Sequence, residues 1–260
     1  MRPIKVFQIL NILFYIFLAA PLLIVILTSF SDSSYLVFPP KGFTLSWYEH
    51  VFTDGRYLQP FINSLIVAIV STGFALVLGI MISLAIKRYD FKFKGLISSL
   101  FLSPLIVPTL LLGIGLLILF SNLGVTNAYV RLILAHTVLT IPYVIRAVSA
   151  GLSKLNPSVE EASRVLGASP FLTTFLVTLP LIRPALISGA FFGFIISFDE
   201  LVVALFLTSS NVVTLPILIY SDIQFNLDPS ISAISSVLII GTVILGLISM
   251  KFIDKKSFFG

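Results

Sequence analysis

The sequence predicts an all-α integral membrane protein with six transmembrane helices. Of its 260 residues, 58% are hydrophobic and 10% are charged, whereas soluble domains carry about 25% charged residues. Residues 6–31, 57–86 and 95–130 contain no Asp, Glu, Lys or Arg. Each run is longer than the ~20 apolar residues that span a bilayer. This composition excludes a soluble enzyme, a disordered protein and a fibrous repeat.

Six apolar segments define the expected spans, in this order along the chain: residues 6–30, 61–86, 96–120, 129–150, 184–207 and 231–252. Each should be a helix, because lipid offers the backbone no hydrogen-bond partner and the segments lack the alternation of a β-barrel strand. The first apolar run is too long for a signal peptide, so we expect it to remain as a span. The spans use nearly the whole chain, which predicts a single transmembrane domain over residues 1–260.

The basic residues predict the orientation. Of the 16 Lys and Arg residues, 13 lie at the termini or in the loops after the second and fourth spans, and Lys41, Arg56 and Arg131 lie on the other side. Because cytoplasmic loops are enriched in Lys and Arg, both termini should be cytoplasmic. The basic residues are scattered at span ends and form no basic face, so nucleic acid is not an expected partner.

The cytoplasmic loop 151–183 is long and patterned, and it should contain two short helices. Pro157 suits a first turn, and Ser158 with Glu161 forms a capping-box pattern. Gly167 is typical of the residue that ends a helix. A second helix follows and should end at Leu179-Pro180. Such an amphipathic helix suits either a membrane surface or a groove on a cytoplasmic partner, and periodicity leaves both open.

Three short sequence elements favour docking on a cytoplasmic partner. They are Glu161-Ala162-Ser163, Gly167 and Val177-x-Leu179-Pro180, separated by three and nine residues. They resemble the EAA motif of ABC-importer permeases, from which Ser163 and Val177 are the two departures. In that family this loop is the coupling element that docks on the ATPase subunit. The resemblance therefore implies a coupling loop at 151–183 whose residues include Glu160, Glu161, Ala162, Ser163, Gly167, Leu179 and Pro180.

A second stretch, Ser197-Phe198-Asp199-Glu200, resembles the spermidine/putrescine permeases, in particular the second of their two permease subunits. Asn63-Ser64 resembles the opening of the family's transmembrane core, here about residues 61–252. The resemblance implies the fold of a type I ABC importer transmembrane domain. It also implies import of polyamines, with iron, sulfate, molybdate, thiamine and phosphonates as the alternative solutes that related permeases serve.

The same resemblance implies the partners and the location. The expected partners are a second permease subunit in a heterodimer, two ATPase subunits and a periplasmic or lipoprotein substrate-binding protein, in a bacterial inner membrane. The chain has no G-x-x-x-x-G-K-[ST] phosphate loop. ATP and Mg²⁺ should therefore bind the ATPase, and we expect no cofactor, metal or catalytic residue on this chain.

Asp199 and Glu200, with Phe198, are the candidate residues of a substrate pathway. Asp199 lies about 24 Å along a helix from Arg183, at the outer part of the membrane or its edge. Charges at that depth are costly and face protein or water, and two carboxylates would suit a cation. The alternative is that the pair caps a break in the fifth span or ends it.

The sequence offers little support for two other classes of function. An intramembrane enzyme would need a nucleophile–base or metal constellation, but the chain has no cysteine and two histidines. Of these, His136 is a lone imidazole for which helix packing or pore lining is expected. A self-contained secondary transporter would need ion-coupling groups in several spans. Asp222 and Asp228, in the last outer loop, are weaker candidates for contact with a binding protein.

Overall fold

The computed structural model describes residues 3–225 and 229–252. Within these ranges the chain is helical, and its one β-type contact is an isolated bridge between Ser209 and Val212. The prediction of an all-α protein is confirmed. Asp228 lies outside the described residues.

Four of the six expected spans are single helices: α1 (Pro3–Thr28), α3 (Leu58–Arg88), α6 (Ala128–Ser153) and α13 (Ser230–Phe252). Each is long and apolar enough to cross a membrane. Large apolar side chains stand exposed along them, among them Phe17 (74%), Met81 (62%) and Met250 (67%). Such surfaces suit a hydrocarbon environment, which solvates apolar groups. In that environment every backbone hydrogen bond must be made within the helix.

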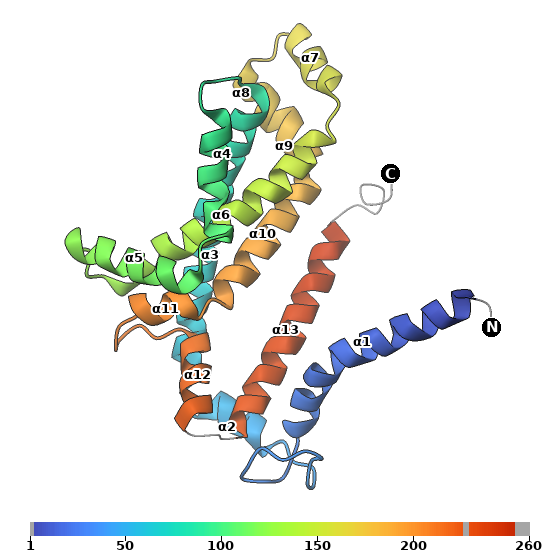
Figure 1. The fold of residues 1–260 in the computed structure, drawn as a ribbon, viewed down its shortest axis with the longest axis vertical. Helices are drawn as coiled ribbons and strands as arrows, with labels where there is room; N and C mark the ends of the chain where they lie inside the picture. The colour runs from blue at the N-terminus through green and yellow to red at the C-terminus, as the bar shows by residue number, and fades with distance from the viewer. Residues whose placement is uncertain (1–2, 226–228, 253–260) are drawn as a thin grey trace. The chain divides into compact units, whose positions relative to one another are not determined.

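The third expected span is not one straight helix. It consists of α4 (Lys94–Leu102), a 3-10 turn (Ser103–Leu105) and α5 (Thr109–Asn122). The two parts meet at 105°, which Figure 1 shows as the elbow between α4 and α5. Pro104 and Pro108 explain the break, because proline cannot donate a backbone hydrogen bond and disfavours helical geometry at the residue before it.

The fifth expected span also differs from the prediction. Its first part is α10 (Arg183–Phe198), and residues 199–201 separate it from α11 (Val202–Leu207). A helical stretch leads into α10: α8 (Pro170–Thr173), a π-helix at Thr174–Thr178 and α9 (Leu179–Leu181). This stretch meets α10 at 75°. With each bent pair counted as one span, the described residues hold six candidate spans.

The chain divides into two compact units. The smaller comprises Met1–Pro60 and Leu218–Ile244, and it includes α2 (Ser46–Thr53) and most of α12 (Leu215–Phe225). Neither of these short helices was predicted. The larger unit comprises Phe61–Ile217 and Leu245–Gly260. The expectation of a single domain over the whole chain stays a prediction.

The smaller unit contains a buried polar cluster around Asp222, whose side chain is fully buried. Arg56 forms an ion pair with one carboxylate oxygen, and the Tyr57 hydroxyl donates to the other at 3.0 Å. Burial raises the pKa of Tyr57 above its ordinary value, which keeps the hydroxyl proton in place for this bond. The suggestion that Asp222 meets a binding protein is wrong, because its carboxylate is not accessible.

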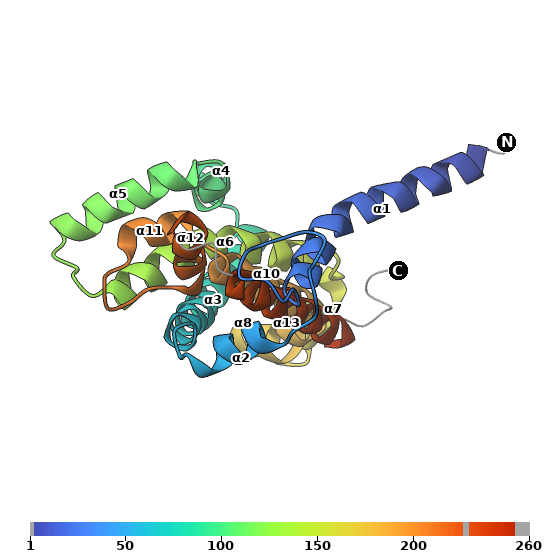
Figure 2. The same cartoon turned by 90° about the horizontal axis from the view of Figure 1, so that it is seen from below.

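In the larger unit, α3, α6 and α10 pack closely because small residues lie where they meet. A Cβ on Gly79 of α3 would lie 2.6 Å from Val144 Cγ1 of α6, and one on Gly151 would lie 2.5 Å from Ala185 Cβ of α10. Small residues let helix backbones approach in membranes, where packing rather than hydrophobic exclusion holds helices together. Figure 2 shows α5 beside α11 in the same unit, and these two helices are in contact.

Candidate functional site

The first helix of the coupling loop, α7 (Pro157–Val165), is capped two residues earlier than expected. The Asn156 side chain accepts a hydrogen bond from the backbone N–H of Ser158 at 3.1 Å. The predicted capping box at Ser158 is therefore wrong, because Asn156 is the cap and Pro157 takes the first helical position. The expected stop is confirmed, since Gly167 has φ +91°, a conformation that favours glycine.

The second helix of the loop begins at Pro170. The Ser169 hydroxyl oxygen accepts from the backbone N–H of Leu172 at 3.2 Å, and Pro170 follows the cap. The helix passes through the π-helical turn at Thr174–Thr178 and continues to Leu181. Such turns carry one extra residue and are frequent at functional sites.

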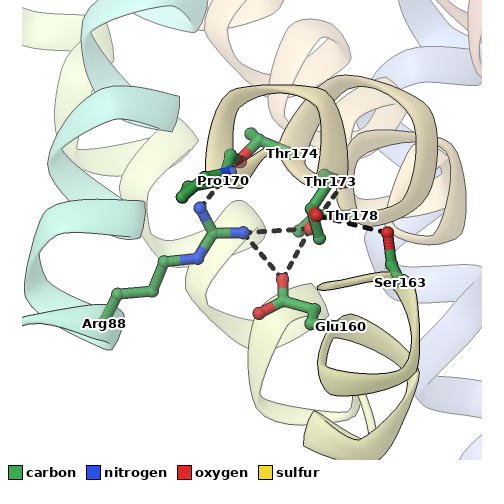
Figure 3. Close-up of polar contacts among 7 residues, drawn as sticks. All are labelled: Arg88, Glu160, Ser163, Pro170, Thr173, Thr174 and Thr178. Carbon is green, nitrogen blue, oxygen red and sulfur yellow. Dashed lines mark hydrogen bonds and ion pairs between the residues drawn. The ribbon is translucent and has the colours of Figure 1, made fainter. Parts of the chain in front are cut away.

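An arginine from outside the loop joins its two helices (Figure 3). Arg88, the last residue of α3, donates from Nη2 to Glu160 Oε1 at 2.7 Å and to Thr178 Oγ1 at 3.0 Å. Its Nη1 donates to Thr174 Oγ1 at 2.6 Å. The Thr178 hydroxyl in turn donates to Glu160 at 2.5 Å. One guanidinium therefore holds α7, the π-helical turn and the end of α3 together.

This cluster keeps Glu160 ionised. Burial by itself favours the neutral acid, but the hydrogen bonds from Thr178 and Arg88, with the Arg88 charge, lower the pKa of Glu160 below its ordinary value. The side chains of Arg88 and Glu160 are 18% and 17% exposed. At that burial the pair is more strongly coupled than an exposed ion pair, and loss of one partner leaves the other charge without compensation.

The opposite side of α7 is exposed. Val165 and Leu166 are each 87% exposed, and Glu161 and Ala162 also face outward. Ser163 turns inward and shares a hydrogen bond with Thr173 at 3.2 Å. The seven predicted coupling residues thus fall into two sets: an inward set of Glu160, Ser163 and Leu179, and an exposed set of Glu161, Ala162, Gly167 and Pro180.

The acidic pair of the candidate pathway lies in the break between α10 and α11. Asp199 directly follows α10, and Glu200 Oε1 accepts from the backbone N–H of Val203 at 2.9 Å. Glu200 therefore caps the first turn of α11, as the alternative interpretation of this pair required. Asp199 is exposed and makes no such cap.

A cavity of about 230 Å³ lies beside this break. Its walls come from the proline-broken segment after α4, from α6 and from the end of α10: Pro104, Leu105, Val107, Thr109, Leu139, Tyr143, Ile195, Ile196, Asp199 and Glu200. Phe198 is not among these residues. Its ring packs instead against Phe61, with centroids 5.9 Å apart, and against Phe194, with centroids 5.7 Å apart.

His136 serves helix packing. It is buried, and its Nδ1 lies 2.8 Å from the Ser197 hydroxyl, which lies 2.9 Å from the Ser71 hydroxyl. This chain of contacts connects α6, α10 and α3. Among the described residues, no group of three His, Cys, Asp or Glu side chains could hold a metal ion.

Arg88, Thr174, Thr178 and Tyr143 were not identified from the sequence. Arg88 is 72 residues from Glu160, and its position at a span end explained it as an orientation charge. No local pattern signals a partner at that distance. The threonines lie in an apolar helical stretch, and Tyr143 is one aromatic residue among many in the spans.

Comparisons with known proteins bear on the whole chain. Residues 75–258 match the family model of the binding-protein-dependent transport system inner membrane component. The spermidine/putrescine transport system permease protein PotC of Escherichia coli K12 is 30% identical over 243 residues, covering 94% of this chain and 92% of the relative. The putrescine transport system permease protein PotI of the same strain is 32% identical over 251 residues, covering 94% and 89%.

A solved structure supports the fold. A bacterial ABC transporter involved in the import of the acidic polysaccharide alginate matches with a TM-score of 0.76 and 17% identity, covering 96% of this chain and 98% of that chain. At that identity the match shows the fold alone, a type I importer membrane domain. The chain therefore belongs to the binding-protein-dependent transport system inner membrane component family, as an integral membrane permease subunit of an ABC importer.

Proposed function

We propose that this permease subunit imports polyamines, spermidine or putrescine, along a path that passes Asp199. A separate ATPase docks on the exposed face of α7 and drives the transport. A binding protein delivers the substrate on the outer face, and a second permease subunit completes the membrane path. Both termini lie in the cytoplasm of a bacterial cell, as the asymmetry of Lys and Arg supports.

The cavity beside Asp199 is the observation that carries this proposal. Two carboxylates and no Lys or Arg are found among the described residues that line it, beside apolar groups such as Leu139, Ile195 and Ile196. A polyamine offers matching chemistry, with ammonium groups for the carboxylates and methylene chains for the apolar wall. Sulfate, molybdate and phosphonate would be repelled by this charge.

Energy reaches the path through the coupling loop. ATP and Mg²⁺ bind the partner ATPase, and closure of that ATPase displaces α7. The exposed Val165, at the end of α7, and Leu166, directly after it, offer an apolar docking face. Only contacts that differ between the inward-open and outward-open states can shift the equilibrium between them. Glu161 and Gly167 act as parts of this docking element rather than as catalysts.

Substitution of the two acids tests the path. Asp199→Asn should reduce polyamine uptake by about tenfold or more, because hydrogen bonds to a charged group contribute roughly 1.5–3 kcal/mol. Glu200→Gln should have a smaller effect, since the amide oxygen still accepts from Val203. Uptake is measured with labelled putrescine in vesicles that contain the whole transporter, with the exposed Asp90→Asn as the charge-matched control.

Equal uptake by wild type and Asp199→Asn would contradict the proposed path. The substrate is tested separately, through ligand binding by the partner binding protein. Binding of thiamine and not of polyamines would overturn the polyamine assignment while leaving the importer unchanged.

A further inference from the structure

Helix α3 is not adjacent to the coupling loop in sequence, because α4, α5 and α6 lie between them. The loop continues directly from α6 and leads directly into α10, so motion of the loop reaches those two helices through the backbone. Motion can reach α3 from the loop through side chains. Arg88 supplies three hydrogen bonds to it, two of them to threonines on the stretch that precedes α10 and one to Glu160 on α7.

The geometry suits the transmission of a displacement. The planar guanidinium donates in three directions to groups on both loop helices, and an arginine fork loses little rotamer freedom for each bond it forms. Thr174 and Thr178 are buried, so these bonds are sheltered from water. A lysine at this position would keep the charge but would lack the fork.

Helix α3 is long enough to carry the displacement across the larger unit. It has 31 residues, which corresponds to about 46 Å. Its buried positions after residue 70 are occupied by small residues, Ser71, Thr72, Ala75, Gly79 and Ser83. Small residues let the backbones of α3 and its neighbours approach closely over this stretch.

The other end of α3 holds the connection between α11 and α12. The Asn63 amide donates to the carbonyl oxygen of Val213 at 2.8 Å, and Ser64 Oγ accepts from the backbone N–H of Leu215 at 2.9 Å. The Tyr129 hydroxyl, at the start of α6, donates to Asn63 Oδ1 at 2.7 Å. This connection follows α11, whose first turn is capped by Glu200 at the cavity.

We propose that α3 carries the motion of the coupling loop to the connection after α11, with Arg88 as the positioning residue that fixes the loop to α3. The inference rests on the proposed coupling role of the loop. Arg88 touches neither substrate nor nucleotide in this scheme. It determines whether α3 moves together with α7 when the ATPase closes.

The absence of cysteine from this chain allows a direct test with a single reporter. Ser210→Cys introduces a thiol at an exposed turn between α11 and α12. The rate of its reaction with a fluorescent maleimide is measured in the purified whole transporter, with and without a non-hydrolysable ATP analogue, and the label on this chain is resolved on a gel. The readout uses no polyamine, so it is independent of the substrate assignment.

The Ser210→Cys protein with an otherwise unchanged sequence should show a nucleotide-dependent change in labelling rate. Arg88→Gln should abolish that change and lower transport per ATP hydrolysed by a factor within the range of about 5- to 150-fold that is typical of coupling between sites. Arg88→Lys should lose part of both. Lys87→Gln removes one charge from the exposed neighbouring residue and should alter neither.

Three results would overturn the inference: no nucleotide-dependent change at Ser210→Cys, persistence of that change in Arg88→Gln, or an equal loss in Lys87→Gln. If Arg88→Gln does not assemble with the ATPase, Arg88→Lys decides the matter through the same two measurements. Normal coupling in Arg88→Lys would then contradict the role of the three-way fork. Failure of polyamine uptake alone, with the labelling change intact, would count against the proposed substrate and not against α3.

Discussion

Two adjacent glutamates of the coupling loop have different environments. Successive residues of a helix point about 100° apart, so Glu160 faces Arg88 and Thr178 while Glu161 faces outward. The sequence motif begins at Glu161, which is exposed where a partner can reach it. Glu160 precedes the motif and connects α7 to the rest of the larger unit. A single step along the helix therefore separates an exposed carboxylate, Glu161, from the one that attaches the loop, Glu160.

The lowered pKa of Glu160 predicts how the stability of the loop depends on pH. Its folded-state pKa lies below the ordinary value of 4.5, so its contribution to loop stability is complete above that value and is lost as the pH falls through the lowered pKa. Hydrogen exchange of residues 157–181, corrected for intrinsic rates, should show constant protection from neutral pH down to about 4.5. Protection should then decrease on further acidification.

Glu160→Gln is the control for this pH dependence. It should reduce protection of the loop already at neutral pH, by about 1.5–3 kcal/mol for the lost charged hydrogen bonds. Its acid-dependent loss should be smaller than that of the wild type. An identical acid-dependent loss in both proteins would contradict the assignment to Glu160.

At the scale of the element, proline and small residues decide where helices break and where they pack. Pro104 and Pro108 turn one apolar run into the α4–α5 elbow, and this elbow supplies part of the cavity wall. The break after Phe198 exposes Asp199 to the same cavity. Hydropathy predicts that these segments lie in a membrane, but it does not predict that each is broken into two helices.

Two glycines test the packing of these elements. A methyl group at Gly79 would lie 2.6 Å from Val144 Cγ1, whereas one at Gly115 would meet nothing within 4 Å. Gly79→Ala should therefore destabilise the protein by about 1–3 kcal/mol through overpacking. Gly115→Ala should leave stability unchanged or increase it by up to about 1 kcal/mol, because alanine favours helix. Thermal unfolding of the purified protein compares the two, and equal midpoints would contradict the close α3–α6 packing.

At the scale of the whole molecule, charge distribution predicts how the chain sits in the membrane. The two sides of the chain differ in basic residues rather than in hydropathy, and the membrane potential and insertion machinery favour Lys and Arg in the cytoplasm. The six candidate spans have an even count, so both termini should lie on the same side.

Cysteine labelling in intact cells checks this orientation. Asp54→Cys lies before α3 and Asp90→Cys lies after it, and both positions are exposed. A membrane-impermeant maleimide should label Asp54→Cys from outside and should label Asp90→Cys only after the membrane is permeabilised. The reverse pattern would show the inverted topology and would remove the loop 151–183 from the cytoplasm.

The sequence by itself determined the membrane class, the number of candidate spans, the two helices of the coupling loop and the family. These properties depend on local quantities: the length of apolar runs, residues that start or stop helices, and the fixed spacing of Glu161, Gly167 and Pro180. The same local signals misplaced the cap of α7 by two residues, because Asn156, Pro157 and Ser158 all favour a helix start.

Only the tertiary structure decided which residues meet. It brought Arg88 to Glu160 across 72 residues, gave Glu200 a capping role and left Asp199 at a cavity with Tyr143 and the proline elbow. Composition and spacing cannot reveal such pairs, since hydrogen bonds and cavities depend on where helices cross and how they bend. That geometry is set by close packing of the whole unit rather than by any one segment.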